Sequence, residues 1–158
     1  MGQKVRYDGQ HKRHDMILEM LSPYCEFVPL CPEVAIGLTI PRPPIHLITQ
    51  GRNIHAVGVD DLTLDVTVDL KNNAKDVMIE HWDLCGYIFK SKSPSCGMNN
   101  TALDGKKEAG VSGIYAAQVQ AMRPELPMTT EDVLQNKAGC EDFLEKLRNY
   151  SAEPQAKL

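Results

Sequence analysis

Apolar side chains recur at helical spacing in separate stretches of the chain. The first stretch, residues 14–21, predicts a helix that Pro23 ends, with an apolar side formed by Ile17, Leu18 and Leu21. In the C-terminal part we expect a helix over residues 110–121, the start of another at 131–134, and an amphipathic helix over 140–150.

The alternation of apolar and polar residues from Leu62 to Leu70 fits a strand, but it also fits the entry to a helix capped by Thr67. We favour an extended segment over residues 62–66, followed by a helix that runs to about His81. The apolar face of this helix is Leu70, Ala74, Val77, Met78 and Trp82.

Two short apolar runs, residues 26–30 and 86–90, predict buried strands. Because such strands alternate with helices along the chain, we predict an α/β fold, with a parallel sheet flanked by helices in a Rossmann-like three-layer arrangement. In sheets of this kind, ligands bind beyond the carboxyl ends of the strands. Cys31 follows the first expected strand and Cys96 follows the second, so we expect both thiols at one rim.

Two thiols at one rim can bind a metal, form a redox pair or remain as inert buried side chains. Cys31 precedes Pro32 and Glu33, which place a rigid turn and a carboxylate beside the thiol. Cys96 lies in the Ser-Pro-Ser-Cys-Gly turn of residues 93–97, whose amides and hydroxyls can donate toward sulfur. These surroundings favour a soft-metal or iron–sulfur site.

Lysines and arginines close to these motifs have two interpretations. Lys90 and Lys92 precede Cys96 and would favour its thiolate. The basic run at residues 11–14 and Arg42 in a proline-rich loop fit either an ordinary solvated face or a cationic lip that holds a phosphate or an anionic substrate.

Composition narrows the class of protein. With 158 residues, 42% of them hydrophobic and 24% charged, the chain is long enough for one globular domain with a real core. The formal net charge of −4 argues against a general polyanion binder. The sequence lacks a long apolar run and a secretory signal, and its cysteines are odd in number with no CxxC pair. We therefore expect no membrane span, no disulfide framework, no zinc finger and a reducing, cytoplasmic location.

Three motifs, in this order and spacing, resemble the thiouracil desulfurase (TudS-like) family. They are Val-Arg-Tyr-Asp-Gly-Gln-His-Lys at residues 5–12, Val-Pro-Leu-Cys-Pro-Glu at 28–33 with Pro-Arg-Pro at 41–43, and Phe-Lys-Ser-Lys-Ser-Pro-Ser-Cys-Gly at 89–97. The resemblance covers residues 4 to about 135. We therefore expect a single domain over residues 1–158, with the family-like core followed by a terminal helix over 136–150 and a polar tail over 151–158.

The resemblance implies an oxygen-independent desulfidase with a [4Fe-4S] cluster. In the family, three cysteines hold three irons, and the fourth iron takes the sulfur of a thiocarbonyl group. Water then replaces sulfur on a pyrimidine ring and hydrosulfide leaves. By position, Cys31 and Cys96 match two of the ligands, and Glu33 is the candidate acid/base. The candidate orienting groups are Ser91, Lys92 and Ser93.

We expect the substrate to be a small thiolated pyrimidine, either a free base or a nucleotide. Relatives associated with RNA substrates carry a further domain, whereas this sequence ends at Leu158, so tRNA is the less favoured partner. Candidate substrate-binding residues are Arg6, Asp8, Arg42 and Lys90, and Lys12 and Arg13 are further candidates for contact with a nucleotide phosphate.

One departure from the family pattern affects the cofactor. The resemblance implies a first strand that ends in a ligand cysteine before the turn at residues 5–9, but this sequence opens at Met1, already within that turn. The first strand and the third ligand cysteine are therefore missing here, which we expect to reflect a shortened chain. The alternatives are a catalytically inactive relative that binds small molecules without a cluster, and a two-cysteine redox or zinc protein.

Overall fold

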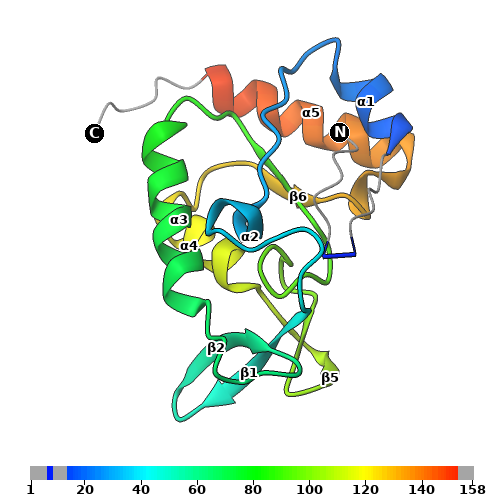
Figure 1. Cartoon of the computed structure of the whole chain (residues 1–158). Helices are drawn as coiled ribbons and strands as arrows, with labels where there is room; N and C mark the ends of the chain where they lie inside the picture. Colours follow the sequence, from blue (N-terminus) through cyan, green and yellow to red (C-terminus); the bar gives the residue numbers. More distant parts are fainter. Residues whose placement is uncertain (1–6, 9–13, 153–158) are drawn as a thin grey trace.

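The computed structural model describes residues 7–8 and 14–152, and the chain folds as a mixture of helices and short strands (Figure 1). The helices are α1 (Asp15–Leu21), α2 (Pro32–Ala35), α3 (Thr67–Glu80), α4 (Ile114–Met122), the 3-10 helix η1 (Val133–Gln135) and α5 (Lys137–Ala152). The strands are β1 (Ile45–Gln50), β2 (Asn53–Gly58), β3 (Tyr87–Phe89), β4 (Thr101–Leu103), β5 (Lys106–Val111) and β6 (Met128–Thr130).

The described strands form three two-stranded sheets rather than one continuous sheet. β1 with β2 and β4 with β5 are antiparallel, whereas β3 and β6 are parallel, with Ile88 opposite Thr129. The α/β class is thus confirmed, but the Rossmann-like three-layer parallel sheet is not. In Figure 1, α1 and α5 lie at one end of the molecule and the hairpins at the other.

A turn with two residues in left-handed backbone conformation accounts for part of this difference. Asp104 and Gly105 have φ values of 50° and 76°, which is the conformation of a tight hairpin turn, and they connect β4 to β5. Because β5 extends to Val111, α4 begins at Ile114, and the expected helical start at residue 110 is wrong. The helices expected at 14–21 and from Thr67 to about His81 are confirmed.

The segment over residues 26–30, expected to be a buried strand, is irregular and largely exposed. Val28 is 43% exposed, and Pro29 has no amide proton to donate to a ladder. Trp82, expected on the apolar face of α3, is likewise 61% exposed, because α3 ends at Glu80. Both predictions fail because apolar character alone does not supply a partner surface.

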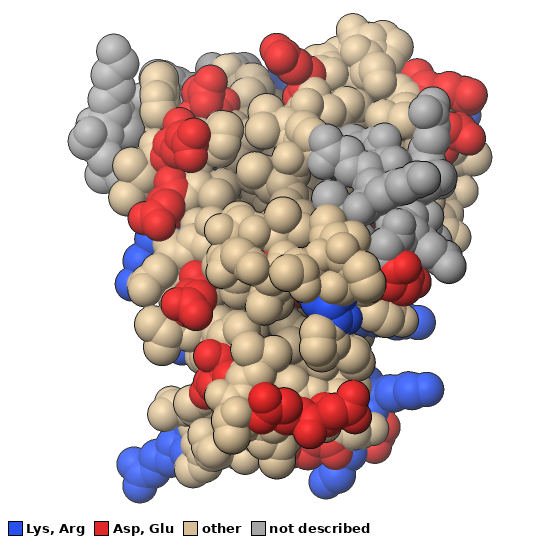
Figure 2. Space-filling view, in the orientation of Figure 1, with Lys and Arg blue, Asp and Glu red and all other residues tan. Residues whose placement is uncertain are grey.

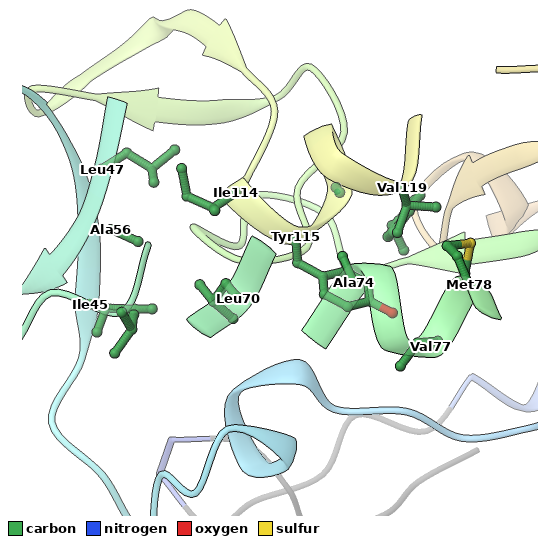
Figure 3. Close-up of a cluster of buried hydrophobic side chains, with 13 residues drawn as sticks. Ile45, Leu47, Ala56, Leu70, Ala74, Val77, Met78, Ile114, Tyr115 and Val119 are labelled. Atoms are coloured by element: carbon green, nitrogen blue, oxygen red, sulfur yellow. The ribbon is translucent and has the colours of Figure 1, made fainter. Parts of the chain in front are cut away.

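The core consists of two clusters of buried side chains. The larger one joins α3 and α4 to β1, β2 and β3, with Leu70, Ala74 and Tyr115 completely buried (Figure 3). The smaller one lies between α1, η1 and α5 and includes Phe143 and Cys140. β3 lies between the two clusters, because Phe89 belongs to the larger and Ile88 packs against the smaller.

A groove of about 780 Å³ is lined by side chains from residues 25–28 and 30, by β3 and by the α5 side chains Phe143, Leu144 and Leu147. Two of the segments that line the groove, residues 25–30 and residues 85–89, run in the same direction. At their first residues, Cys25 and Cys85 are neighbours, since the charge of Cys85, together with burial, raises the pKa of Cys25. Cys31 and the loop after β3 are neighbours where the two segments end.

None of the helices in the described part of the chain has the length and apolar character needed to cross a membrane.

Candidate functional site

Cys31 is placed by the start of α2. Its backbone carbonyl accepts from Ala35 N at 2.9 Å, and Pro32 occupies the first helical position, where no amide donor is needed. The guanidinium of Arg42 reaches back across the proline-rich loop, and its Nη2 donates to Cys31 Sγ at 3.8 Å. The thiol is therefore held next to a fixed positive charge.

Glu33 links the two predicted cysteine motifs. Its Oε2 accepts from Arg42 Nε at 2.7 Å, and its Oε1 accepts from Ser95 Oγ at 2.8 Å. The side chains of Arg42 and Glu33 are only 4% and 15% exposed, and Ser95 is completely buried. A carboxylate with little exposure to water requires such partners, and here the two partners come from two other segments of the chain.

The loop over residues 91–97 is seated on the N-terminus of α4. Pro94 O accepts from Ile114 N, Ser95 O from Ala116 N and Gly97 O from Gly113 N, at 2.8–3.1 Å. These carbonyls satisfy amides that the first turn of a helix leaves open. A Cβ at Gly113 would overlap the backbone of Ser95, so this close seating requires glycine there.

Within this loop, Ser93 orders the backbone around Cys96. Ser93 Oγ accepts from Cys96 N at 3.1 Å and from Ser95 N at 3.3 Å, which leaves the hydroxyl as part of the turn. Lys92 has φ 59° and is exposed, and its amide donates to Asn100 Oδ1 at 2.8 Å. The backbone of Lys92 is therefore fixed at this position, while the residue stays exposed to solvent.

Charged and polar groups from both cysteine motifs act on the Cys96 thiol. Burial raises its pKa well above the usual range, and the nearby Glu33 and Cys31 raise it further. The Lys90 ammonium and the Ser93 hydroxyl lower it in part. Without metal the thiol therefore keeps its proton at neutral pH, and binding a metal ion must release that proton.

The structure also brings in groups that the motifs did not indicate. Ser95 and Glu131 are buried hydrogen-bonding partners of Glu33 and Ser91. The hydroxyls of Tyr87 and Tyr115 are 3.1 Å apart, and burial raises the pKa of Tyr115 to about 12, so both remain protonated. Glu131 and the tyrosines lie on elements remote in sequence, and no local spacing points to them.

The predicted substrate-binding residues are placed differently. Arg6, Lys12 and Arg13 lie outside the described residues. Asp8 is exposed, and Lys90 is 44% exposed beside Glu131. Arg42 is buried in an ion pair with Glu33 beside Cys31, and its contact with a substrate stays a prediction. Figure 2 shows acidic and basic side chains interspersed on one face, without a continuous basic surface on its described part.

The site supplies two thiols as soft ligands. Cys25 and Cys85 line the groove, and Cys140 is buried in α5, so these three are not part of it. Among the described residues, no group of three or more cysteine, histidine or acidic side chains could hold a metal ion. The site thus offers a pair of thiols beside a half-buried carboxylate and a buried guanidinium.

Comparison with known proteins gives two matches. A family model described as 2-thiouracil desulfurase matches residues 1–131, which include every residue of the site described above. Among solved structures, a [4Fe-4S]-dependent thiouracil desulfidase, TudS, is similar at 32% sequence identity and a TM-score of 0.63, and the match covers 89% of this chain and 91% of that chain. No curated protein matches the chain.

Proposed function

Since this chain belongs to the 2-thiouracil desulfurase family, we propose that it removes the thiocarbonyl sulfur of a thiolated pyrimidine, either thiouracil or thiouridine monophosphate. One water molecule supplies the oxygen of the new carbonyl group, and the sulfur leaves as hydrosulfide. The observation that carries the proposal is the link that Glu33 makes between the two cysteine motifs. Glu33 accepts hydrogen bonds from Arg42, which also contacts Cys31, and from Ser95, which precedes Cys96.

The similarity to a [4Fe-4S]-dependent desulfidase suggests that this chain also uses such a cluster. We propose Cys31 and Cys96 as two of its ligands, since soft thiolates bind iron–sulfur clusters. The described residues offer no third ligand beside them. Because the described residues supply only these two thiols, we assign the proposed steps to protein groups alone.

Glu33 is the proposed acid/base at the reacting carbon. It is a carboxylate at the edge of the thiol pair, and Arg42 and Ser95 fix the positions of both oxygens. A general base must lie within hydrogen-bonding reach of the water it activates, and a fixed carboxylate meets this condition with little reorganisation. Arg42 would stabilise negative charge that develops on sulfur as hydrosulfide leaves.

Ser91, Lys92, Ser93 and Lys90 are proposed to order the opposite side of the site. The backbone of the loop is fixed by Ser93 and by its seating on α4, so the loop is preorganised before a ligand enters. We propose a free base or nucleotide rather than tRNA as substrate, and a reducing, cytoplasmic environment suited to free thiols.

The test is anaerobic reconstitution of the chain with iron and sulfide, followed by assays of hydrosulfide release from thiouracil and from thiouridine monophosphate. Cys31→Ser and Cys96→Ser should each lower the bound iron and abolish hydrosulfide release. Cys85→Ser is the matched control, because Cys85 is exposed on the groove, outside the site. Equal loss in all three variants would refute the assignment of the site.

A second function is consistent with a site in which the described residues supply two thiols. In this alternative the chain binds a thiolated pyrimidine without converting it. Equilibrium dialysis with thiouracil separates the two functions, since binding with neither iron uptake nor hydrosulfide release would establish the alternative.

A further inference from the structure

Glu131 follows β6 directly, and its place is set by the only parallel strand pair among the described residues. β6 pairs with β3 so that the two strands end side by side, and Glu131 N donates to Phe89 O at 3.2 Å. The side chain is thereby delivered to the point where β3 passes into the loop that carries Cys96. Glu131 is 6% exposed.

The carboxylate of Glu131 binds both residues at the entrance to that loop. Its Oε2 accepts from Ser91 N at 2.6 Å, and its Oε1 accepts from Ser91 Oγ at 2.7 Å. Oε1 also accepts from the Lys90 ammonium, which in turn lies 3.2 Å from Ser91 Oγ. Although burial raises its pKa, these hydrogen bonds hold the pKa of Glu131 below its ordinary value, so it is ionised at neutral pH.

These contacts determine what Lys90 and Ser91 can do. The hydroxyl proton of Ser91 is committed to Glu131, so this serine is not a free proton donor. The Lys90 ammonium has three N–H donors and is 44% exposed. These donors face Glu131 Oε1, Ser91 Oγ at 3.2 Å and Ser91 O at 3.3 Å, so the ammonium is held at the end of β3, where its positive charge lowers the pKa of Cys96.

We propose that Glu131 is a positioning residue, which fixes Lys90 and Ser91 at the end of β3 so that the Lys90 ammonium stabilises negative charge on the pyrimidine ring as water adds. This inference rests on the proposed desulfidase function. A fixed ammonium accelerates such a step because its orientation is set before reaction.

The kinetic test uses Glu131→Gln, which keeps the shape of the side chain and removes its charge. We expect kcat for hydrosulfide release to fall about tenfold or more with little change in KM, since small misplacements of catalytic groups cost up to about 100-fold. Lys90→Met should have a similar effect, and the double variant should lose no more than Lys90→Met alone. Glu125→Gln, at an exposed position, is the matched control with wild-type kinetics.

A second measurement works on metal-free chain without turnover. The Ser91 amide donates to a carboxylate, so its proton NMR signal should lie downfield and move upfield as pH falls through the pKa of Glu131. Glu131→Gln should abolish that pH dependence and weaken thiouracil binding measured by equilibrium dialysis no more than Lys90→Met does.

The outcomes separate this inference from the proposed function. Additive losses in the double variant, or unchanged kcat in Glu131→Gln despite loss of the Ser91 signature, would overturn the positioning role. If the wild-type chain released no hydrosulfide, the proposed function would be overturned. The role of Glu131 in turnover would then be overturned as well. The Ser91 signature would then still decide whether the carboxylate fixes this loop.

Discussion

The ion pair between Glu33 and Arg42 is the residue-scale feature on which the thiol site depends. Arg42 is buried and the Glu33 side chain is only 15% exposed, so the charge of each depends on the other. Removing one partner of a buried pair leaves an uncompensated charge, which costs about 3–5 kcal/mol. We expect Arg42→Met to lower the free energy of unfolding by about 3 kcal/mol in urea titrations, somewhat less than a fully buried pair would give.

The double variant Arg42→Met/Glu33→Gln is the control for this prediction. Because Glu33→Gln removes the unpaired charge, the double variant should be more stable than Arg42→Met alone. If the two substitutions had additive effects on stability, the pair would not be coupled and the proposed fixing of Glu33 would be wrong.

Glu131 makes stability depend on pH in a defined direction. Its pKa is lowered in the folded chain from the ordinary value of 4.5, so its stabilisation is present above that value and is lost as pH falls through the folded pKa. The difference in unfolding free energy between wild type and Glu131→Gln should therefore be largest near pH 7 and shrink below about pH 4.5. A difference that stayed constant from pH 7 to pH 3.5 would contradict the lowered pKa.

Site residues could be predicted from the sequence when their functional groups stand together in a short motif, and not when they come from distant segments. Cys31, Glu33 and Cys96 stand in compact motifs, and in the structure Glu33 and Cys31 lie close enough to Cys96 to raise its pKa. The Glu33–Ser95 contact joins residues 62 positions apart, and the Glu131–Ser91 contact joins residues 40 apart. Such contacts come from strand pairing and loop seating, which periodicity does not encode.

At the scale of elements, helices with one apolar face were predictable and short strands were not. α3 buries Leu70, Ala74 and Val77 at helical spacing, so its pattern reports its packing. β5 is exposed over most of its length, and its residues show no alternation to separate it from a helix. Residues 26–30 are mostly apolar but pair with no strand in the described structure, so their composition led to the wrong prediction of a buried strand.

The seating of the 91–97 loop on α4 leads to an element-scale prediction. In Gly113→Ala the new Cβ would overlap the backbone of Ser95, so the loop must move away from the helix. We expect a lower Tm together with loss of iron binding after reconstitution, because Cys96 is displaced with the loop.

Ala117→Gly, on the exposed side of the same helix, is the matched control. It should cost about 1 kcal/mol of stability through helix propensity while leaving the loop in place. Iron uptake should therefore survive in Ala117→Gly at the same temperature. If both variants lost iron equally, general destabilisation rather than loop displacement would be the cause.

For the whole molecule, the groove beside β3 relates the fold to the incomplete ligand set. β3 pairs with β6 through one edge, and for Ile88, in the middle of its other edge, the described structure gives no backbone hydrogen bond. The facing segment over residues 26–30 also makes no backbone hydrogen bonds within the described part of the chain. Since both segments run toward the thiols, one strand placed between them in the same direction would end at Cys31 and Cys96.

This arrangement predicts the effect of an N-terminal extension that supplies the strand and cysteine implied by the family resemblance. Pairing with β3 and burial of the groove should raise Tm by several degrees, given that about 1 kcal/mol corresponds to roughly 2–4 °C for a chain of this size. The added cysteine would complete a group of three thiols, and reconstitution should yield about four irons per chain.

The same extension with serine in place of its cysteine separates the two effects. The strand would still satisfy the open edge of β3, so the gain in Tm should remain, whereas the additional iron should be lost. A gain in iron without a gain in Tm would mean that the cysteine reaches the thiols by a route other than the groove. Loss of both would show that the groove does not accept a strand, and the incomplete ligand set would then favour the chain that binds thiolated pyrimidines without converting them.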